Sequence, residues 1–380
     1  MLKEFGGYNF FSFKEGFIVS FKHKKEILDL LCIKGANASG KTNIIKFLSF
    51  IKFITIDSFT SLTPEKEMMI YSFFHNPNPI SLYIVFEYNG NEYKYEIELT
   101  NKEILKEKIY KKNKRWSLKL ERKKNKITKL SEEFKNFKNV SITRSNASVI
   151  SIFHQYNVKN KDLDNIRNFF TNIKTNVGVY GRRSNEKTFP NYKEISQIYY
   201  KDPEMMQFVI EFMKKADTGI EDIKIIPIDN PETGKKEYIP IFEFIINGKR
   251  HKLQYNEQSN GVKSLYLQLG LYFLALQNQM VLALDEFDTE LHPDLLPLLT
   301  ELFENKKINI HNSQFIFTTH HTSIMDKLGK YRVILVNKEE NESFLYRLDE
   351  IPGDILRPDR KVTTAYKAFK IGGRPRIKNG

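Results

Sequence analysis

The chain has almost no cysteine. Its 380 residues include one, Cys32, so no intramolecular disulfide can form and a zinc site built from several cysteines is excluded. Cys32 lies in an apolar run, where a small buried residue is a more common role than a reactive thiol. Tryptophan also occurs once, at Trp116, and we expect this side chain to pack against the fold.

Long apolar runs are also missing. No stretch approaches the ~18 uninterrupted apolar residues of a membrane helix. The longest apolar region, residues 270–287, is interrupted by Gln-Asn-Gln and ends in carboxylates. Residues 1–11 lack the long apolar core and the small-residue cleavage site of a secretory signal. With 41% apolar residues and a mean hydropathy of -0.46, the sequence predicts a globular protein of the cytoplasm with no membrane contact.

Acidic residues are in the minority. The chain has 60 lysines and arginines against 46 acidic residues, a net charge of +14 and a pI of about 9.4. This balance favours polyanions such as DNA or RNA as partners. The alternative is a lysine-rich composition without any binding role, and we expect the charged β segment to be a solvated sheet face.

The pattern of apolar residues and turns predicts an α/β protein with five segments. We expect a mixed, largely parallel sheet as the core, because strands and helices alternate along the second half. Strands are expected at 16–22, 29–35, 80–99, 114–130, 220–229, 238–248, 250–256, 280–285 and 313–319, and helices at 41–54, 163–177, 202–217 and 261–278. The predicted segments are a first lobe (1–60), an antiparallel β subdomain (61–130), a helical insertion (131–220), a second lobe (221–352) and a basic tail (353–380). We expect the end of the tail to fray, and the alternative is an arm that binds an anion or a partner.

A phosphate-binding loop follows the second predicted strand. Residues 35–42 read Gly-Ala-Asn-Ala-Ser-Gly-Lys-Thr and match the Walker A pattern G-x-x-x-x-G-K-[ST]. The glycines let the backbone direct its N–H groups at a β-phosphate, and the following helix adds its positive end. Lys41 is expected to reach the β- and γ-phosphates, and the Thr42 hydroxyl to ligate Mg²⁺.

Polar side chains end two apolar strands of the second half. Asp285 and Glu286 follow the strand at 280–285, and the carboxyl ends of parallel strands form the edge where ligands bind. We expect Asp285 to hold Mg²⁺ through its water shell and Glu286 to orient or deprotonate the attacking water. The strand at 313–319 ends before His320 and His321, either of which could sense the γ-phosphate.

A third motif lies before the helix predicted at 261–278. Ser259, Asn260 and Gly261 would start this helix, whose first N–H groups have no intrahelical partner. A serine and a glycine at this point suit an anion site, although an ordinary helix cap would look the same.

The order of these motifs resembles the ABC-type ATPase heads of the SMC, Rad50 and RecF group. The residues 285–293, DEFDTELHP, resemble the D-E-x-D-x-x-L-H-P of the Old-family and abortive-infection ATPases. Further stretches that resemble these families are NFFSF (9–13), ITRSNAS (142–148), KKADTGIEDIKI (214–225), QSNGVKSL (258–265), QFIFTTHHTSIMD (314–326) and AYKAFKIGGRPRI (365–377). The stretch 258–265 resembles the shortened signature motif of these families. It lacks the second glycine and the glutamine of the transporter signature, and no Q-loop glutamine can be placed in the sequence.

The resemblance implies an ABC-head fold in which two subunits enclose ATP and Mg²⁺. Residues implied to bind the nucleotide are Gly35, Asn37, Ala38, Ser39, Gly40, Lys41, Thr42 and Asn43 of one subunit, with Ser259, Asn260 and Gly261 of the other. Lys41, Glu286 and His320 are the implied catalytic residues, Thr42 and Asp285 hold the metal, and Asp288 and His292 lie at the dimer seam.

The absences then favour one function among three. No heptad run supports the arms of an SMC protein, and about 60 residues follow His320, too few for a Toprim nuclease domain of ~100–150 residues. We therefore expect an ATPase subunit of an anti-phage or abortive-infection system, similar to those of Septu and PARIS. It would form a dimer or higher oligomer and control a separate effector, a nuclease or toxin. The alternatives are a RecF-like DNA-repair ATPase and a nucleotide-gated scaffold that sequesters an effector.

Overall fold

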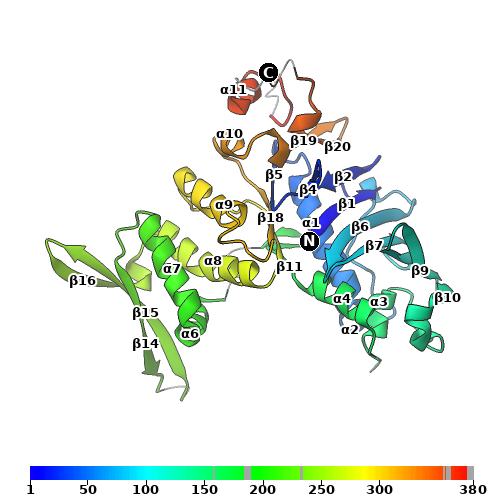
Figure 1. The fold of residues 1–380 in the computed structure, drawn as a ribbon, viewed down its shortest axis with the longest axis horizontal. Helices are drawn as coiled ribbons and strands as arrows, with labels where there is room; N and C mark the ends of the chain where they lie inside the picture. Colours follow the sequence, from blue (N-terminus) through cyan, green and yellow to red (C-terminus); the bar gives the residue numbers. More distant parts are fainter. Residues whose placement is uncertain (157–158, 184–189, 232–233, 354–355, 357–360, 375–380) are drawn as a thin grey trace. The chain divides into compact units, whose positions relative to one another are not determined.

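The computed structural model describes residues 1–156, 159–183, 190–231, 234–353, 356 and 361–374 (Figure 1). The chain forms two compact units. Unit 1 comprises residues 1–182, 279–287 and 312–380, and unit 2 comprises residues 183–278 and 288–311. These units differ from the five predicted segments, because the first part of the predicted helical insertion belongs to unit 1 and the strands between residues 222 and 254 belong to unit 2.

A six-stranded sheet holds the predicted core strands of unit 1. Its order is β11-β17-β18-β5-β19-β20, and all neighbours are parallel except β19 and β20. The strands are β5 (Leu30–Gly35), β11 (Ile173–Thr175), β17 (Val281–Leu284), β18 (Gln314–Thr318), β19 (Val333–Glu339) and β20 (Glu342–Arg347). Every residue of β5, β17 and β18 is buried, as expected for strands covered on both faces.

The second sheet of unit 1 is entirely antiparallel, in the order β10-β9-β8-β7-β6-β1-β2. Its strands are β1 (Leu2–Tyr8), β2 (Phe17–Ser20), β6 (Ile80–Tyr88), β7 (Asn91–Leu99), β8 (Ile104–Lys112), β9 (Trp116–Lys123) and β10 (Lys126–Leu130). Asn89 and Gly90 form the predicted hairpin turn, with φ of 48° and 71°. The sheet extends the predicted β subdomain, because β1 and β2 from the N-terminal segment join it.

Helix α1 (Lys41–Lys52) contributes to one apolar core together with both sheets of unit 1. Phe47 of α1 stacks on Phe5 of β1, with 4.8 Å between the ring centroids, and Ile33 of β5 belongs to the same core. The helix continues directly into a π-helical turn, η1 (Phe53–Asp57), and the short α2 (Ser58–Ser61). The helix that follows the phosphate loop is therefore continuous with a segment that reaches the antiparallel sheet.

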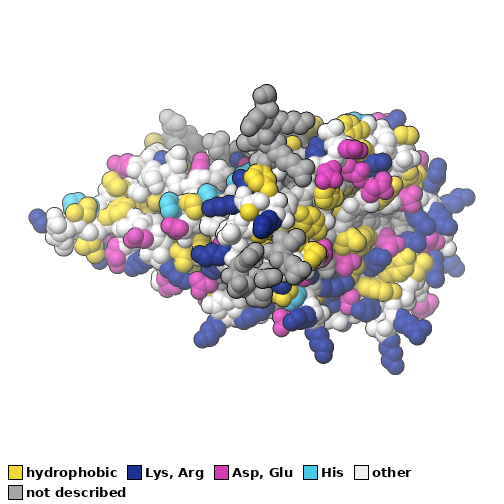
Figure 2. Space-filling model, turned by 90° about the horizontal axis from the view of Figure 1, so that it is seen from above, with side chains coloured by type: hydrophobic (Ala, Val, Ile, Leu, Met, Phe, Trp, Pro, Cys, Tyr) yellow, Lys and Arg dark blue, Asp and Glu magenta, His cyan; other side chains and the backbone are white. Residues whose placement is uncertain are grey.

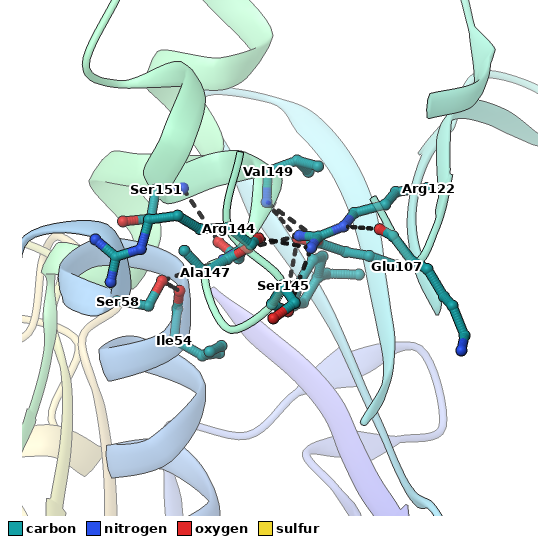
Figure 3. A network of polar contacts seen from close by, with 12 residues as sticks. Ile54, Ser58, Glu107, Arg122, Arg144, Ser145, Ala147, Val149 and Ser151 are labelled. Carbon is teal, nitrogen blue, oxygen red and sulfur yellow. Dashed lines mark hydrogen bonds and ion pairs between the residues drawn. The ribbon is translucent and has the colours of Figure 1, made fainter. Parts of the chain in front are cut away.

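A buried polar network connects this segment to the antiparallel sheet (Figure 3). Arg122 of β9 lies 3.3 Å from Glu107 of β8, and both side chains are completely buried. Arg122 also donates to backbone carbonyls of residues 124, 144, 145 and 147, while Glu107 accepts from the Val149 N–H. Ser58 Oγ accepts from the Ser148 N–H at 3.1 Å and donates to the carbonyl of Ile54. The network thus fixes the stretch 144–149 between the sheet and the continuation of α1.

One predicted helix is wrong in its second half. Residues 163–177 were expected to be helical, but α4 (Lys161–Thr171) ends and residues 173–175 form β11. Ile173 pairs with Val281 in the parallel sheet, and the tertiary hydrogen bonds of that pairing outweigh a continued helix. The correction matters because β11 brings the residues after it to the edge of the parallel sheet.

Short elements complete unit 1. They are β3 (Lys22–His23), β4 (Glu26–Ile27), η2 (Phe73–His75), η3 (Glu132–Phe137), α3 (Val149–Phe153), β12 (Val177–Gly178), β13 (Gly181–Arg182), α10 (Ile324–Leu328), η6 (Lys330–Arg332), η7 (Leu348–Glu350) and α11 (Val362–Lys367). None of the helices in the described part of the chain combines the length and apolar character that a membrane span requires.

The described part of the basic tail is docked on unit 1. The Gly373 N–H donates to Asn337 Oδ1 at the end of β19, and Tyr366 of α11 donates to the carbonyl of Gly373 at 2.8 Å. A methyl group on Gly373 would lie 3.7 Å from the Cα of Gly35, at the start of the phosphate loop. The expectation of a frayed end is therefore wrong up to Arg374, and residues 375–380 lie outside the described part.

Unit 2 contains helices and a three-stranded sheet. Its elements are α6 (Tyr192–Lys201), α7 (Pro203–Lys215), β14 (Asp222–Asp229), β15 (Lys236–Ile246), β16 (Lys249–Gln254), η4 (Tyr255–Glu257), α8 (Asn260–Gln277), η5 (Pro293–Leu295) and α9 (Leu296–Glu304). The strands β14–β16 form an antiparallel sheet of their own, because a tight turn at Asn247 and Gly248 returns the chain. They do not extend the parallel sheet.

Candidate active site

The phosphate loop joins β5 to α1, as the sequence predicts. A side chain at Gly35 would place its Cβ 2.5 Å from the carbonyl oxygen of Val336, and Gly40 has a φ of +112°, so both positions require glycine. Helix α1 has no side-chain cap at its N-terminus and no acidic residue in its first turn. The loop therefore ends in backbone N–H groups and a positive helix end that favour an anion.

The Lys41 side chain is buried at this loop. Its ammonium donates to the carbonyl oxygens of Gly35 at 3.0 Å and Ala36 at 2.8 Å. Burial lowers the pKa of Lys41, while the carboxylates of Asp285 and Glu286 oppose that shift. The cation is thus held within the loop and near the two carboxylates.

Other loop residues also face polar neighbours. Ser39 is buried, and its hydroxyl has no hydrogen-bond partner among the described residues. Asn43 donates to Ser12 Oγ at 2.8 Å, which connects α1 to the NFFSF stretch. Asn37 is exposed, and Ala38 adopts a φ of 59°. An unpartnered buried hydroxyl is costly, and an anion bound to the loop would satisfy it.

The Asp285 carboxylate accepts two hydrogen bonds from hydroxyl groups. Thr42 donates to Asp285 Oδ2 at 2.7 Å, and Thr318, the last residue of β18, donates to Asp285 Oδ1 at 2.6 Å. Asp285 is 3% exposed. The two side chains predicted to ligate Mg²⁺ therefore lie next to each other, although they come from residues far apart in the sequence.

The Glu286 carboxylate lies between two basic side chains. One oxygen is 3.2 Å from His320 Nε2, and the other is 3.4 Å from Arg182 Nε of β13. The Glu286 N–H donates to Thr318 Oγ1 at 2.7 Å, and its φ of 47° turns the chain away from the strand direction. The His321 N–H donates to Thr319 Oγ1. The structure thus brings Lys41, Asp285, Glu286 and His320 together at one sheet edge.

Three residues at this edge were missed by the sequence reasoning. Asn176, just after β11, accepts from the Asp285 N–H at 2.7 Å and donates to the Asp285 carbonyl at 2.8 Å, and it is buried. Thr318 connects the Asp285 carboxylate to the Glu286 backbone N–H, and Arg182 contacts the Glu286 carboxylate. Thr318 could have been found from the sequence, because it ends the predicted strand before His320. Asn176 and Arg182 could not, because residues 173–175, which precede them, were predicted to be helical but form β11.

The predicted signature residues belong to unit 2. Ser259 caps α8 by accepting from the Val262 N–H at 3.4 Å, and α8 has no acidic residue in its first turn. Asn260 is exposed, and a Cβ added at Gly261 would lie 3.2 Å from the carbonyl oxygen of Glu290. The role of these residues toward a nucleotide of another subunit stays a prediction.

The predicted seam residues also belong to unit 2. Asp288 is 6% exposed and its carbonyl accepts from the Leu291 N–H. The His292 side chain is 71% exposed, and its Nδ1 accepts from the Asp294 N–H at 3.3 Å, which caps the short helix η5. The buried aspartate supports the local turn, while His292 is open to a partner.

One protein-family model matches most of the chain. A model of the family described as “AAA domain, putative AbiEii toxin, Type IV TA system” matches residues 30–326. This range includes the phosphate loop, both carboxylates and His320. None of the curated proteins matches the chain.

Three solved structures are similar in fold. An SMC head domain from Thermotoga maritima is 16% identical, with 91% of this chain and 98% of that chain covered and a TM-score of 0.45. An SmcHead bound to the C-winged helix domain of ScpA gives 14% identity, 97% and 99% coverage and a TM-score of 0.47. The recombination mediator protein RecF-ATPrS gives 12% identity, 92% and 98% coverage and a TM-score of 0.41. At these values the likeness carries no information about substrates or partners.

Proposed function

The chain belongs to the AAA-domain family described as “AAA domain, putative AbiEii toxin, Type IV TA system”, and from that premise we propose that it is the ATPase subunit of an anti-phage or abortive-infection system. It is a P-loop ATPase with an α/β fold. The family description names a toxin of a toxin–antitoxin system, which supports a role in which ATP turnover controls a toxic activity. In our proposal that activity belongs to a separate effector protein, a nuclease or toxin.

The nucleotide would bind at the phosphate loop of unit 1. Lys41 would exchange its loop carbonyls for the β- and γ-phosphates, and the unpartnered Ser39 hydroxyl is available to the same ligand. Thr42 Oγ1 and the Asp285 carboxylate, 2.7 Å apart, suit Mg²⁺, which prefers oxygen ligands and keeps several waters. Magnesium bound there would neutralise charge on the phosphate oxygens.

Hydrolysis would depend on Glu286. Its carboxylate would accept a proton from the water that attacks the γ-phosphorus, and the products are ADP and phosphate. His320 and Arg182 hold the two carboxylate oxygens, so the base is oriented before the nucleotide arrives. The observation that carries this proposal is the convergence of Thr42, Asp285, Glu286 and His320 through direct hydrogen bonds and an ion pair.

A second copy of the chain would complete the site. Ser259 and Gly261 begin the 18-residue helix α8, whose first N–H groups suit the γ-phosphate of a nucleotide held by another subunit. ATP bound between two subunits would then stabilise the dimer, and ATP hydrolysis would let the subunits dissociate.

The first prediction concerns turnover and assembly. Lys41→Ala should abolish ATP binding, and Glu286→Gln should bind ATP but lower kcat by at least about a hundredfold, because the base is lost and its shape is kept. Colorimetric phosphate release gives kcat, and light scattering gives the oligomeric state.

The controls separate the roles. With ATP, Glu286→Gln should accumulate as a dimer or a multiple of dimers, whereas Glu286→Gln with Ser259→Arg should bind ATP and stay monomeric. Wild-type protein with no phosphate release, or with release that persists in both single variants, would contradict the ATPase assignment of these residues.

The defence role needs a separate test in cells. Bacteria that express the chain with its neighbouring genes should resist phage infection, and Lys41→Ala should remove the resistance. Resistance that survives Lys41→Ala would favour the scaffold alternative, and DNA-stimulated hydrolysis without any resistance would favour the RecF-like alternative.

A further inference from the structure

The positive charge of the chain is concentrated in one segment. Residues 102–138 contain fifteen lysines and arginines against five glutamates, a net charge of +10 out of the +14 of the chain. They form β8, β9, β10 and η3 in unit 1. Figure 2 shows many lysine and arginine side chains protruding on the right of the view, the side on which Figure 1 draws β9 and β10 of unit 1.

Several of these cations belong to ion pairs on the sheet. Lys112 contacts Glu92 at 3.2 Å, and Lys106 contacts Glu121 at 4.0 Å. Such paired side chains support the expected solvated sheet face and do not by themselves indicate a ligand.

Two hairpin turns differ from this pattern. The β3–β4 turn carries Lys24 and Lys25, and the β8–β9 turn carries Lys114 and Arg115. All four side chains are exposed, and none has an ion-pair partner in the described part of the chain. Four unneutralised cations on two turns are an arrangement that attracts a polyanion.

A groove of about 490 Å³ is lined by residues of the β3–β4 turn and by the two strand residues that flank the β8–β9 turn, so Lys114 and Arg115 lie next to it in the chain. The β3–β4 side includes Lys24 and Lys25, and the β8–β9 side includes Lys112 and Trp116. The further lining residues are Lys3, Glu4, Lys22, Glu26, Ile27, Tyr83, Val85, Glu92 and Lys94. Glu4 and Glu92 are neutralised by lysines within 3.2 Å, and six lysines against three glutamates in the lining leave the groove a positive balance.

Trp116 does not pack into the core, in contrast to the sequence-based expectation. The side chain is 40% exposed at the rim of the groove, and the Lys112 ammonium lies 5.6 Å from its ring centroid. An accessible aromatic ring among cations is the arrangement on which an unpaired base stacks.

We propose that the groove between the β3–β4 and β8–β9 turns binds single-stranded nucleic acid, with Trp116 stacking on a base and Lys24, Lys25, Lys114 and Arg115 contacting the backbone phosphates. A single strand is favoured over a duplex, because a paired base has no free face for the indole. It is favoured over an acidic peptide because a peptide of carboxylates would leave the indole uncovered. The proposal does not depend on ATP binding.

The single tryptophan gives a direct test. The full chain without nucleotide is titrated with an unlabelled oligothymidylate of about 20 nucleotides, and the tryptophan fluorescence is followed at 50 and 200 mM salt. Stacking on Trp116 should quench the emission. A duplex should bind more weakly and leave the emission unchanged, and so should a polyglutamate peptide.

Two sets of variants test the residues by fluorescence anisotropy of a labelled strand. Trp116→Leu should weaken binding roughly tenfold, because stacking contributes ~1–3 kcal/mol per base. Replacing Lys24, Lys25, Lys114 and Arg115 by glutamine should reduce the salt slope of log K by about 3, since each phosphate contact to a single strand contributes ~0.7.

The matched control replaces four other exposed cations of the segment 102–138, Lys123, Lys126, Lys129 and Lys138, again by glutamine. This control should keep the quenching and most of the affinity. Equal losses in the two quadruple variants, an unquenched wild type, or quenching by the duplex equal to that by the single strand would overturn the proposal. Intact ATPase activity in Trp116→Leu would show that the variant is folded, and binding without ATP separates this result from the proposed function.

Discussion

At the scale of single residues, the active site depends on short polar side chains between the better-known motifs. Thr318 donates to the Asp285 carboxylate and accepts from the Glu286 N–H, so one hydroxyl fixes both acidic residues. Asn176 pairs with both backbone groups of Asp285. These hydrogen bonds hold the Asp285 carboxylate in one orientation. A side chain that ligates a metal ion needs such a fixed orientation.

The Thr318→Val variant should therefore keep the side-chain shape at this position but no longer hold Asp285 and Glu286 in place. Without the hydroxyl, Asp285 Oδ1 and the Glu286 N–H lose their partner, and we expect kcat to fall by roughly tenfold to a hundredfold with a higher Mg²⁺ requirement. Steady-state hydrolysis over a series of Mg²⁺ concentrations measures both effects. Thr318→Ser keeps the hydroxyl and should stay near wild type. Normal kcat and normal Mg²⁺ dependence in Thr318→Val would argue against this role.

At the scale of elements, the helix after the phosphate loop is connected to the antiparallel sheet by buried polar contacts. Helix α1 runs into η1 and α2, and the stretch 144–149 packs between α2 and the pair formed by Arg122 and Glu107. In unit 2, the Tyr199 hydroxyl accepts from the Gly270 N–H and donates to the Tyr266 carbonyl, so it is inserted into the hydrogen-bond ladder of α8. Buried polar contacts of this kind fix the continuation of α1 in unit 1 and the middle of α8 in unit 2.

The Arg122→Met variant should destabilise unit 1 strongly. It leaves Glu107 as a buried charge without its cation and removes donors to several carbonyls, so we expect a loss of ~3–5 kcal/mol in the free energy of unfolding. Urea unfolding followed by circular dichroism measures this loss. Lys119→Met, on the same strand, removes the ion pair with the partly exposed Glu133 and should cost at most about 1 kcal/mol. Similar losses of unfolding free energy in the two variants would show that the buried pair of Arg122 and Glu107 contributes no more to stability than the exposed ion pair.

At the scale of the whole molecule, the residues that we propose to bind the nucleotide divide between the two units. The phosphate loop, both carboxylates and His320 belong to unit 1, whereas Ser259 and Gly261 belong to unit 2. ATP bound by unit 1 alone should therefore stabilise that unit first. The interface with a second subunit would add its effect only when a partner is present.

Ligand binding should be visible as thermal stabilisation. Mg²⁺-ATP at about 100 times its Kd should add ~2.7 kcal/mol and raise the unfolding midpoint by several degrees. Hydrogen exchange should slow at the N–H groups of residues 36–42, and Lys41→Ala should show neither effect. An equal thermal shift in Lys41→Ala would mean that ATP binds elsewhere.

Several features could be predicted from the local sequence alone. The Walker A pattern fixes a glycine-bounded loop before a helix, because only glycine fits against the Val336 carbonyl and at a φ of +112°. The Asn89-Gly90 turn and the buried strands before Asp285 and His320 follow from side-chain shape and polarity over a few neighbouring residues. These signals are local, so they do not need the rest of the fold.

Other features were decided only by tertiary structure. Residues 173–175 become a strand because Ile173 finds a parallel partner in Val281, and this pairing brings Asn176 and Arg182 to the carboxylates. Trp116 is exposed because of where the sheet places its turn, which no local pattern encodes. These hydrogen bonds and ion pairs join residues more than a hundred positions apart in the sequence. The local sequence therefore determines which side chains could take part in catalysis, and the tertiary structure determines which of these side chains lie next to one another.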